Sequence, residues 1–455
     1  MSNSMRATLA FGVVGLLLVA VGFGQSWSVA LSIFNLCLIS AVMSLGVNIQ
    51  WGYAGLFNIG IMGFAALGGA AAMLVSMPPV SNAWAAGGMN IMYSAILFLA
   101  TVIAAVLVYK KMPAGRLRSL VMIAVIVAGF FATRKFFDPA VSAIEATESA
   151  KTGFLGGLGL PIILSWPVGG LFAAGAAWII GKVALGLRAD YLAIATLGIS
   201  EIIVAILKNE DWLTRGVKNV TGLPRPVPYE LELQQSDWFV ALVERLRSSD
   251  LAGLEGLARD AALREALTES ASVFVKLCYA GLFAAVLLMV LTLCVLALNS
   301  PWGRMMRAIR DNETAAEAMG KDVTGRHLQV FILGSAVCGI AGAMLTTLDG
   351  QLTPTTYIPL RYTFLIWVMV IVGGSGNNLG AILGGFIVWF VWIESEPGGV
   401  WLMGVLTAWL PEGSAVKIHL LESAQHMRLF VMGLVMLLVM RFAPRGILPE
   451  QIKKN

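Results

Sequence analysis

The sequence predicts an all-α membrane protein whose helices cross a lipid bilayer many times. Of its 455 residues, 58% are apolar and only 13% are charged, and the mean hydropathy is +0.82, which excludes an ordinary water-soluble fold. The apolar residues also gather in long runs. The 49 glycines agree with this class, because helices that pack in lipid use small residues to approach one another closely.

The membrane spans follow from the lengths of the apolar runs. A helix needs about 20 apolar residues to cross about 30 Å of hydrocarbon, and shorter runs must be paired or tilted, so we predict about 10–12 transmembrane helices. The first run follows Arg6 and lacks a small-residue cleavage site, so we interpret it as a span and not as a cleaved signal. The candidate spans are residues 7–23, 28–48, 56–75, 90–109, 118–134, 162–182, 190–208, 276–298, 327–347, 362–374, 376–393 and 428–441.

Basic residues in the loops between spans predict the orientation. Lysine and arginine are retained on the cytoplasmic side during membrane insertion. They concentrate in the turn 110–118, in the loop 299–326, and in the tail after the last span. We therefore expect these segments and both termini in the cytoplasm. The net charge of +5 then reflects membrane orientation, and we see no basic and aromatic patch that would bind nucleic acid.

Three parts of the chain can be separated. They are the N-terminal transmembrane helices 1–208, an insertion on the outer side at 209–275, and the C-terminal transmembrane helices 276–455 with the cytoplasmic loop 299–326. The insertion carries mixed charges, and we expect it to be small and mostly helical, with helices near 237–247 and 256–267. Apolar residues recur there at helical spacing, namely Phe239, Leu242, Val243 and Leu246. The insertion would either cap the outer mouth or bind a partner.

No pattern in the chain indicates an enzyme. The string nearest to a phosphate-binding GxxxxGK[ST] motif spans 175–183, where five residues separate the glycines and Val183 replaces the required hydroxyl. The four cysteines lie inside apolar runs, and His419 and His426 flank Glu422 without a third metal ligand. We therefore expect no catalytic residue, no metal site and no cofactor in this chain.

Glu201 is the one acid that clearly lies within a predicted span. It follows Tyr191 by ten residues, or about 15 Å along a helix, which places it near the middle of the membrane. A charge there costs at least about 2.5 kcal/mol, so Glu201 either lines a polar pathway or makes a buried hydrogen bond between helices. Ion-coupled transporters usually have several such acids, so we expect any energy source to lie outside the chain.

The loop 299–326 predicts two short helices. In the first, arginines recur every third residue on one side, and an apolar side is also present. The arginines are Arg304, Arg307 and Arg310, and the apolar residues are Met305, Met306 and Ile309. A positively charged cytoplasmic loop would explain these arginines as well.

The second helix of the loop has clear end signals. Asp311 or Asn312 can cap it, Glu313 lies in its first turn, and Gly320 ends it. The ordered string ETAAEAMG at 313–320 resembles the coupling loop, with its EAA-and-glycine pattern, that permeases of ABC importers insert into a groove of their ATPase. A capped helix pair in the cytosol is suited to such docking.

The resemblance extends to the branched-chain amino-acid permease family, and within it to the LivM-type subunit. It is carried by LGVNIQWGYAGLFNIGIMGFAALGG at 45–69, by residues 187–226, by 300–348 with RAIRDNETAAEAMG, by 357–385 with VMVIVGGSGNNLGAILGG, and by RFAPRGIL at 441–448. Arg215 and Val217 depart from the family, which tends to have glycine and proline there. The departure leaves the local turn, and contact with a binding protein, open.

The resemblance implies an ABC importer permease fold in a bacterial inner membrane. The partners would be a second homologous permease chain, two cytoplasmic ATPase subunits that hold ATP and magnesium, and a periplasmic binding protein that delivers leucine, isoleucine or valine. Solute would cross by alternating access. The same architecture could carry urea, short amides or other amino acids, and a stand-alone channel or an ion-coupled transporter remains the alternative from a different class.

Site residues follow from the matched stretches. Residues expected to couple to the ATPase are Arg304, Arg307, Arg310, Asp311, Glu313, Ala316, Glu317 and Gly320. Residues expected in the translocation pathway or in helix packing are Asn48, Gly52, Asn58, Gly60, Glu201, Gly376, Gly380 and Gly384. Residues expected to contact the binding protein are Thr214, Asn219 and Gly222.

Two physical arguments accompany this assignment. The glycines and asparagines at 48–60 make a polar break between apolar spans, which a membrane tolerates only where the break is buried or faces water. The spacing Gly376-x3-Gly380-x3-Gly384 puts small residues on one side of a helix, which favours close packing over substrate contact.

Overall fold

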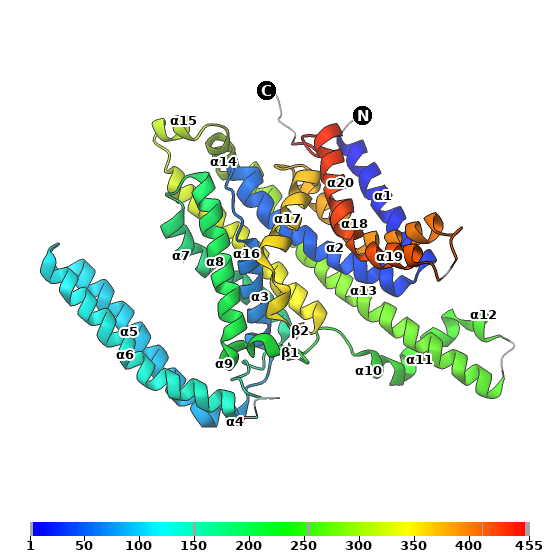
Figure 1. Cartoon of the computed structure of the whole chain (residues 1–455), viewed down its shortest axis with the longest axis horizontal. Helices are drawn as coiled ribbons and strands as arrows, with labels where there is room; N and C mark the ends of the chain where they lie inside the picture. The colour runs from blue at the N-terminus through cyan, green and yellow to red at the C-terminus, as the bar shows by residue number, and fades with distance from the viewer. Residues whose placement is uncertain (1–2, 149–151, 253–254, 412, 451–455) are drawn as a thin grey trace.

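The computed structural model describes residues 3–148, 152–252, 255–411 and 413–450. These residues form an all-α bundle (Figure 1). The strands found in this part of the chain are β1 (Val220–Thr221) and β2 (Gln351–Leu352), which pair antiparallel with Val220 opposite Leu352. The predicted fold class is therefore confirmed.

Each of the twelve predicted spans falls on a helix. Nine helical segments of the described chain are long and apolar enough to cross a membrane, and α19 with α20, bent by 60°, would be a tenth. Two further apolar helices, α3 and α17, have only 16 and 15 residues. The helices are α1 (Asn3–Gly24), α2 (Trp27–Val47), α3 (Ile61–Ser76), α5 (Met89–Lys111), α6 (Arg116–Ala146), α7 (Ser165–Ala184), α8 (Ala189–Asn209), α13 (Gly256–Asn299), α16 (Val323–Asp349), α17 (Pro359–Gly373), α18 (Asn378–Leu406) and α20 (Met427–Phe442).

Short elements connect these helices. The short α-helices are α4 (Ser81–Ala83), α9 (Asp211–Thr214), α10 (Glu230–Gln235), α11 (Asp237–Leu246), α12 (Ser248–Leu251), α14 (Pro301–Asp311), α15 (Glu313–Ala318) and α19 (Ala415–Ser423). Single π-helical turns are η1 (Asn48–Gly52) and η2 (Trp84–Gly88), and 3-10 turns are η3 (Ile162–Leu164), η4 (Gly216–Lys218), η5 (Pro354–Thr356) and η6 (Ala424–His426).

Glycines set the spacing of the central helices α3, α7 and α16. A Cβ atom at Gly68 on α3 would collide with the backbone oxygen of Gly339 on α16, and one at Gly342 would collide with the oxygen of Ala65. Backbones can approach this closely only where no side chain lies between them. Helices in lipid gain little from the hydrophobic effect, so close packing of this kind stabilises their association. The high glycine content therefore serves the core.

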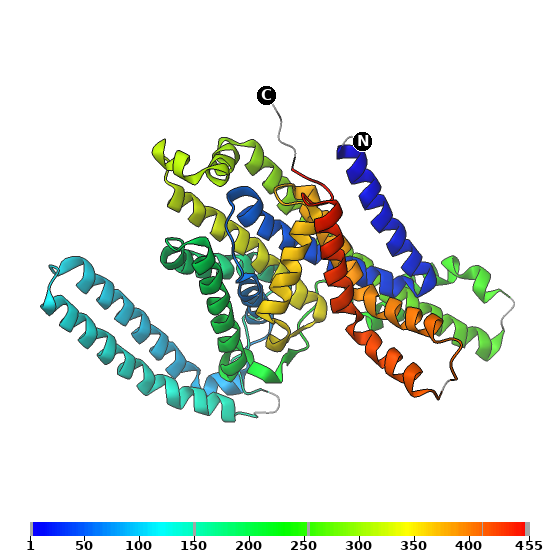
Figure 2. The same ribbon diagram turned by 45° about the horizontal axis from the view of Figure 1, so that its top comes forward.

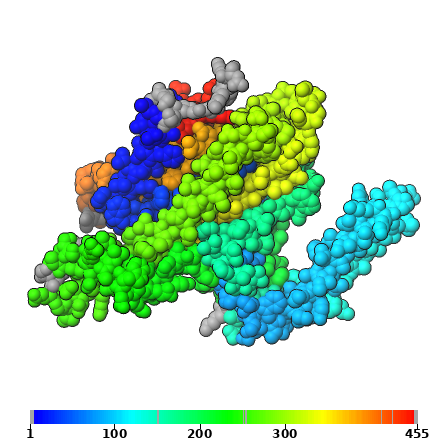
Figure 3. All heavy atoms as spheres, turned by 180° about the vertical axis from the view of Figure 1, so that it is seen from behind, coloured from blue at the N-terminus to red at the C-terminus, as the bar shows by residue number. Residues whose placement is uncertain are grey.

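The α5–α6 hairpin projects away from the rest of the bundle (Figures 1 and 2), and it forms a separate arm in the space-filling view (Figure 3). In the apolar windows of its two helices, only 6% of α5 and 0% of α6 are buried. Helix α6 continues to Ala146, beyond the predicted end at 134, and Arg134 pairs with Asp138 one turn later at 2.9 Å. The arm exposes apolar side chains on all sides.

The insertion at 209–275 has the two helices predicted for it. Helix α11 matches the stretch near 237–247, and α13 begins at Gly256. Phe239 and Val243 of α11 are buried, and the Phe239 ring lies 5.7 Å from that of Phe274 on α13. Helix α13 then runs for 44 residues without a break through the expected boundary at 275. At its second connection the insertion therefore continues into the bundle as one helix.

Candidate functional site

Helices α14 and α15 form an exposed angled segment, residues 300–322, which we call the elbow. It lies at the same end of the molecule as both chain termini (Figure 1). Ser300 caps α14 through a hydrogen bond from the Gly303 amide (3.4 Å), and Asn312 caps α15 by accepting from the Ala315 amide (3.0 Å). Of the two capping residues considered for α15, the structure uses Asn312.

Gly320 closes the elbow in a left-handed conformation, with φ of +76°. The Gly320 amide donates to the Glu317 carbonyl at 2.8 Å, and the Lys321 amide donates to the Ala316 carbonyl at 3.1 Å. This pair of bonds is the Schellman helix ending, which favours glycine at its left-handed position. From 311 to 320 every residue is exposed except Ala316, and Met319 is 79% exposed. The second half of the elbow is therefore accessible on the surface of this chain.

The three arginines of α14 do not share one side, which corrects the sequence-based expectation. Residues three apart fall about 60° behind one another on a helix, so the direction turns by about 120° over two steps. Arg304 is exposed, whereas Arg307 is half-buried and donates to the Leu298 carbonyl at 3.3 Å. Arg310 points into the bundle, with only 20% of its side chain exposed.

Arg310 joins the elbow to three separate segments. Its guanidinium donates to the carbonyl oxygen of Gly52, where α2 breaks, and forms an ion pair with Glu450 near the C-terminus at 2.9 Å. It also contacts Asp311 at 3.2 Å. A Cβ atom at Gly376, between α17 and α18, would lie 3.2 Å from the Arg310 guanidinium. Arg310 of α14 therefore lies against both helix breaks.

Glu450 is a site residue that the sequence analysis missed. The chain before it lies against the end of α17, where the Ile447 amide donates to the Val372 carbonyl and the Leu448 amide to the Gly373 carbonyl, each at 2.9 Å. These bonds hold the C-terminal segment beside the α17–α18 turn. The available signal was that Glu450 is the only acid in an otherwise basic tail.

Asn48 lies fully buried at the break of α2. Its Oδ1 accepts from the Gly376 amide at 2.8 Å, and its Nδ2 donates to Asn378 Oδ1 at 3.1 Å. The Tyr53 hydroxyl donates to the same oxygen of Asn378. Asn48 therefore ties the α2 break to the α17–α18 turn, and within this chain it acts in packing.

Asn58 is buried in the extended stretch that precedes α3. It donates to Gln50 Oε1 at 2.9 Å and accepts from the Gly60 amide at 2.8 Å, and its carbonyl accepts from the Trp367 indole at 3.0 Å. The polar break is thus satisfied by side chains, as a membrane interior requires. A Cβ atom at Gly60 would collide with the Thr196 carbonyl on α8, so this glycine also serves packing.

The glycine stripe of α18 packs against α17. A Cβ atom at Gly384 would collide with the Met369 carbonyl oxygen, and Gly380 lies against the backbone of Gly373. The stripe begins at Gly380, because α18 starts at Asn378 and Gly376 precedes it with φ of +82°. The expectation that Gly376 belongs to the helical stripe is therefore wrong.

Replacing Gly384 with alanine is expected to destabilise the bundle by about 1–3 kcal/mol, because the added methyl group forces α17 and α18 apart. The midpoint of thermal unfolding in detergent would fall. Gly175→Ala is the matched control, since a Cβ atom on this exposed part of α7 meets nothing within 4 Å. Equal midpoints for the two variants would contradict the packing assignment.

Glu201 lies on the exposed side of α8. The exposed residues of this side between Tyr191 and Ile206 recur with helical spacing and are uncharged apart from Glu201, with Tyr191 61%, Ile194 69%, Ile202 58% and Ile206 49% exposed. Among the described residues Glu201 makes no hydrogen bond or ion pair, so a bond to another helix of this chain is not the reason for its position. The α8 face is the set Tyr191, Ile194, Gly198, Glu201, Ile202, Ala205 and Ile206.

On the opposite end, the segment expected to contact a binding protein is partly buried. Thr214 is 0% exposed and donates to the Leu207 carbonyl at 2.7 Å, so it holds the end of α8, and the predicted surface role is wrong for this residue. Asn219 is half-buried, and Gly222 is exposed with φ of +76°. Arg215 adopts φ of +59°, which explains why a glycine suits this position.

Long apolar helices around a glycine-packed core define a multi-pass membrane protein. A family described as the permease component of branched-chain amino acid transport systems matches residues 29–440. The chain belongs to this family.

Individual relatives agree with the family. The high-affinity branched-chain amino acid transport system permease protein LivM of Escherichia coli (strain K12) is 27% identical over 313 residues, which cover 68% of this chain and 61% of that protein. A probable branched-chain amino acid transport permease protein LivH of Methanocaldococcus jannaschii is 32% identical over 103 residues, covering 23% of this chain and 32% of that protein.

A further relative, the fructose import permease protein FrcC of Rhizobium meliloti, is 32% identical over 110 residues, which cover 23% of this chain and 31% of that protein. The chain spans 61% of the length of the Escherichia coli LivM protein. No solved structure matches it.

Proposed function

We propose that this chain is the membrane-spanning permease subunit of an ATP-driven importer for branched-chain or related amino acids. The observation that supports this most directly is the contact of Arg310 with the Gly52 carbonyl and with Glu450, which links the exposed elbow to the breaks beside α2 and α17. Force applied to the elbow would reach the helices that form the bundle. The chain needs no catalytic residue for this role, because ATP and magnesium are held by partner subunits.

The elbow divides into an outward and an inward part. Its outward residues would dock in a groove of the ATPase, and these are Arg304, Asp311, Glu313, Glu317 and Gly320, all exposed. Ala316 is 8% exposed and positions α15, while Arg310 transmits the movement inward. Arg307 belongs to the inward part, because it hydrogen-bonds the end of α13.

The translocation pathway would lie along the α8 face. A carboxylate exposed among isoleucines cannot remain against hydrocarbon without a large energetic cost. A second permease chain, packed beside α8, would cover the isoleucines and leave Glu201 facing a polar pathway between the two chains. The similarity to a LivH protein as well as to LivM supports a pair of related permeases. Opening and closing of this pathway to each side in turn is alternating access.

The remaining partners and the orientation follow from the same scheme. Two ATPase subunits would bind on the cytoplasmic side, which places the elbow and both termini in the cytoplasm and the chain in a bacterial inner membrane. A periplasmic binding protein would dock at the opposite end, on the insertion 209–275 and near Gly222 within it. The chain would then divide into helices 1–208, this insertion, and helices 276–455.

Reconstitution in liposomes tests the proposed function. We expect uptake of radiolabelled leucine only when this chain is combined with its second permease, both ATPase subunits, ATP and the loaded binding protein. Uptake of urea, short amides and fructose is measured with the same complex. Transport of one of these in place of leucine would identify it as the substrate. Uptake by this chain alone would overturn the proposal and favour the channel or ion-coupled transporter that Glu201 could also serve.

Glu201→Gln is expected to reduce uptake about tenfold, because it removes the charge from the proposed pathway at little change in size. Glu201→Asp keeps the carboxylate and should retain most uptake. Initial rates in the reconstituted complex, normalised to the amount of assembled protein, measure both effects. Full uptake by the glutamine variant would show that Glu201 plays no part in the pathway.

A further inference from the structure

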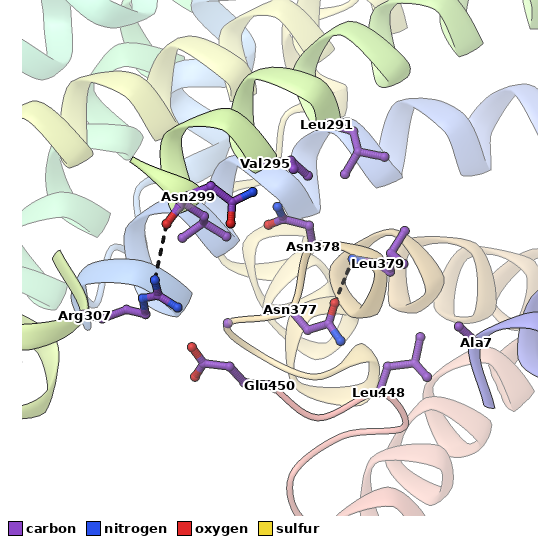
Figure 4. Close-up of a pocket in the computed structure, with 12 residues that line it drawn as sticks. Ala7, Leu291, Val295, Asn299, Arg307, Asn377, Asn378, Leu379, Leu448 and Glu450 are labelled. Carbon is purple, nitrogen blue, oxygen red and sulfur yellow. Dashed lines mark hydrogen bonds between the residues drawn. The ribbon is translucent and has the colours of Figure 1, made fainter. Parts of the chain in front are cut away.

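A cavity of about 530 Å³ lies beside the elbow, between the ends of α1, α13 and α18 (Figure 4). Its lining comes from segments far apart in the sequence, including Ala7, Leu291, Arg307, Asn378 and Glu450. Figure 4 shows the charged and amide side chains toward one side of this cavity and leucine, valine and alanine side chains toward the other. The cavity is therefore amphipathic.

The polar side is lined by one cation, Arg307, and one anion, Glu450. Glu450 is neutralised by its ion pair with Arg310 at 2.9 Å. Arg307 forms no ion pair within the described chain, and the Leu298 carbonyl takes only one of its guanidinium N–H groups, at 3.3 Å. The guanidinium keeps further donors in a planar fork, a geometry that suits a phosphate group. Asn378 also lines the cavity, and its Oδ1 accepts hydrogen bonds from Asn48 and Tyr53.

The apolar side continues onto the surface that would face lipid. Leu291 and Val295 lie one turn apart on α13, and Val295 is 42% exposed. Ala7 contributes from α1, whose apolar window is only 17% buried. A ligand in this cavity can therefore place an anionic group at Arg307 and extend a hydrocarbon chain along α13 into the bilayer.

We propose that this cavity binds an anionic phospholipid of the inner leaflet, with its phosphodiester on Arg307 and an acyl chain against Leu291 and Val295. The assignment of the leaflet rests on the orientation proposed above. Because Arg307 belongs to α14, the bound lipid would help to fix the position of the elbow. A free phosphate ion shares the chemistry of the headgroup but gains nothing from the apolar wall.

Lipid binding by the purified full chain, delipidated in detergent, tests this proposal without any transport assay. We expect native mass spectrometry to show saturable binding of phosphatidylglycerol, with about tenfold weaker binding of phosphatidylethanolamine because its ammonium cancels the charge. Inorganic phosphate at the same concentration should not compete. Equal binding of the two lipids, or full competition by phosphate, would overturn the proposal.

Two variants locate the site. Arg307→Gln is expected to weaken phosphatidylglycerol binding about tenfold, whereas Arg304→Gln, on the exposed side of the same helix, should leave it unchanged. Val295→Trp fills the apolar side from an exposed position and should also displace the lipid while the fold is kept. The proposal fails if Arg307→Gln and Arg304→Gln behave alike, or if Val295→Trp binds phosphatidylglycerol normally.

Discussion

Replacing Gly320 with proline is expected to abolish ATP-driven uptake while the chain still inserts in the membrane. Proline holds φ near −65°, whereas Gly320 has φ of +76°, and proline lacks the amide that donates to Glu317. A proline ring cannot reach this φ, so the variant cannot form the helix ending that closes the elbow. Uptake and leucine-stimulated ATP hydrolysis by the reconstituted complex should fall together.

A matched pair of alanine variants separates the role of the elbow in uptake from the general effect of replacing a left-handed glycine. Gly350 ends α16 at the other end of the molecule with φ of +65°, and, as at Gly320, a Cβ atom there meets nothing within 4 Å. Alanine costs about 1–2 kcal/mol at either position. Uptake should fall clearly for Gly320→Ala and little for Gly350→Ala. A Gly320→Pro variant that transports normally would remove the coupling role of the elbow.

Arg310→Ala is expected to reduce uptake about tenfold or more, with the assembled complex still present. The substitution leaves the Gly52 carbonyl and the Glu450 carboxylate without their donor, and each loss of a largely buried charged partner costs about 1–3 kcal/mol. The elbow would then move without carrying α2 and the α17–α18 turn with it. ATP hydrolysis should continue while leucine uptake falls, so the ratio of transport to hydrolysis is the quantity to measure.

A double-mutant cycle tests whether Arg310 and Glu450 act as a pair. Glu450→Ala should lower the same ratio, and the double variant should be little worse than Arg310→Ala alone. Arg445→Ala, in the same C-terminal segment but exposed, is the control and should transport normally. Effects of Arg310→Ala and Glu450→Ala that simply add would contradict the proposed contact.

The existence of the helices could be predicted from the sequence, but several of their ends could not. An apolar run long enough to cross a bilayer determines a helix by itself. The ends of α6 and α13 extend into charged sequence, where Arg134 pairs with Asp138 within α6 and Phe274 of α13 packs on α11. Those contacts depend on tertiary structure or on local pairing that hydropathy does not measure.

The site was predicted in part. The caps and the closing glycine of the elbow are local signals, so Asn312 and Gly320 were found. The ion pair of Arg310 with Glu450 joins residues 140 positions apart, and no local pattern indicates it. The family resemblance also misassigned Thr214, because a motif identifies a position but does not say whether its side chain is buried.

Helix α13 offers a mechanical consequence of its own. Its 44 residues span about 66 Å, so one continuous helix joins the insertion at 209–275 to the capped start of α14. If α13 tilts as a unit by about 5° around one end, its other end moves by about 6 Å, roughly the pitch of one helical turn. Docking of a protein on α11 could thus displace the start of α14 through the backbone of α13 alone.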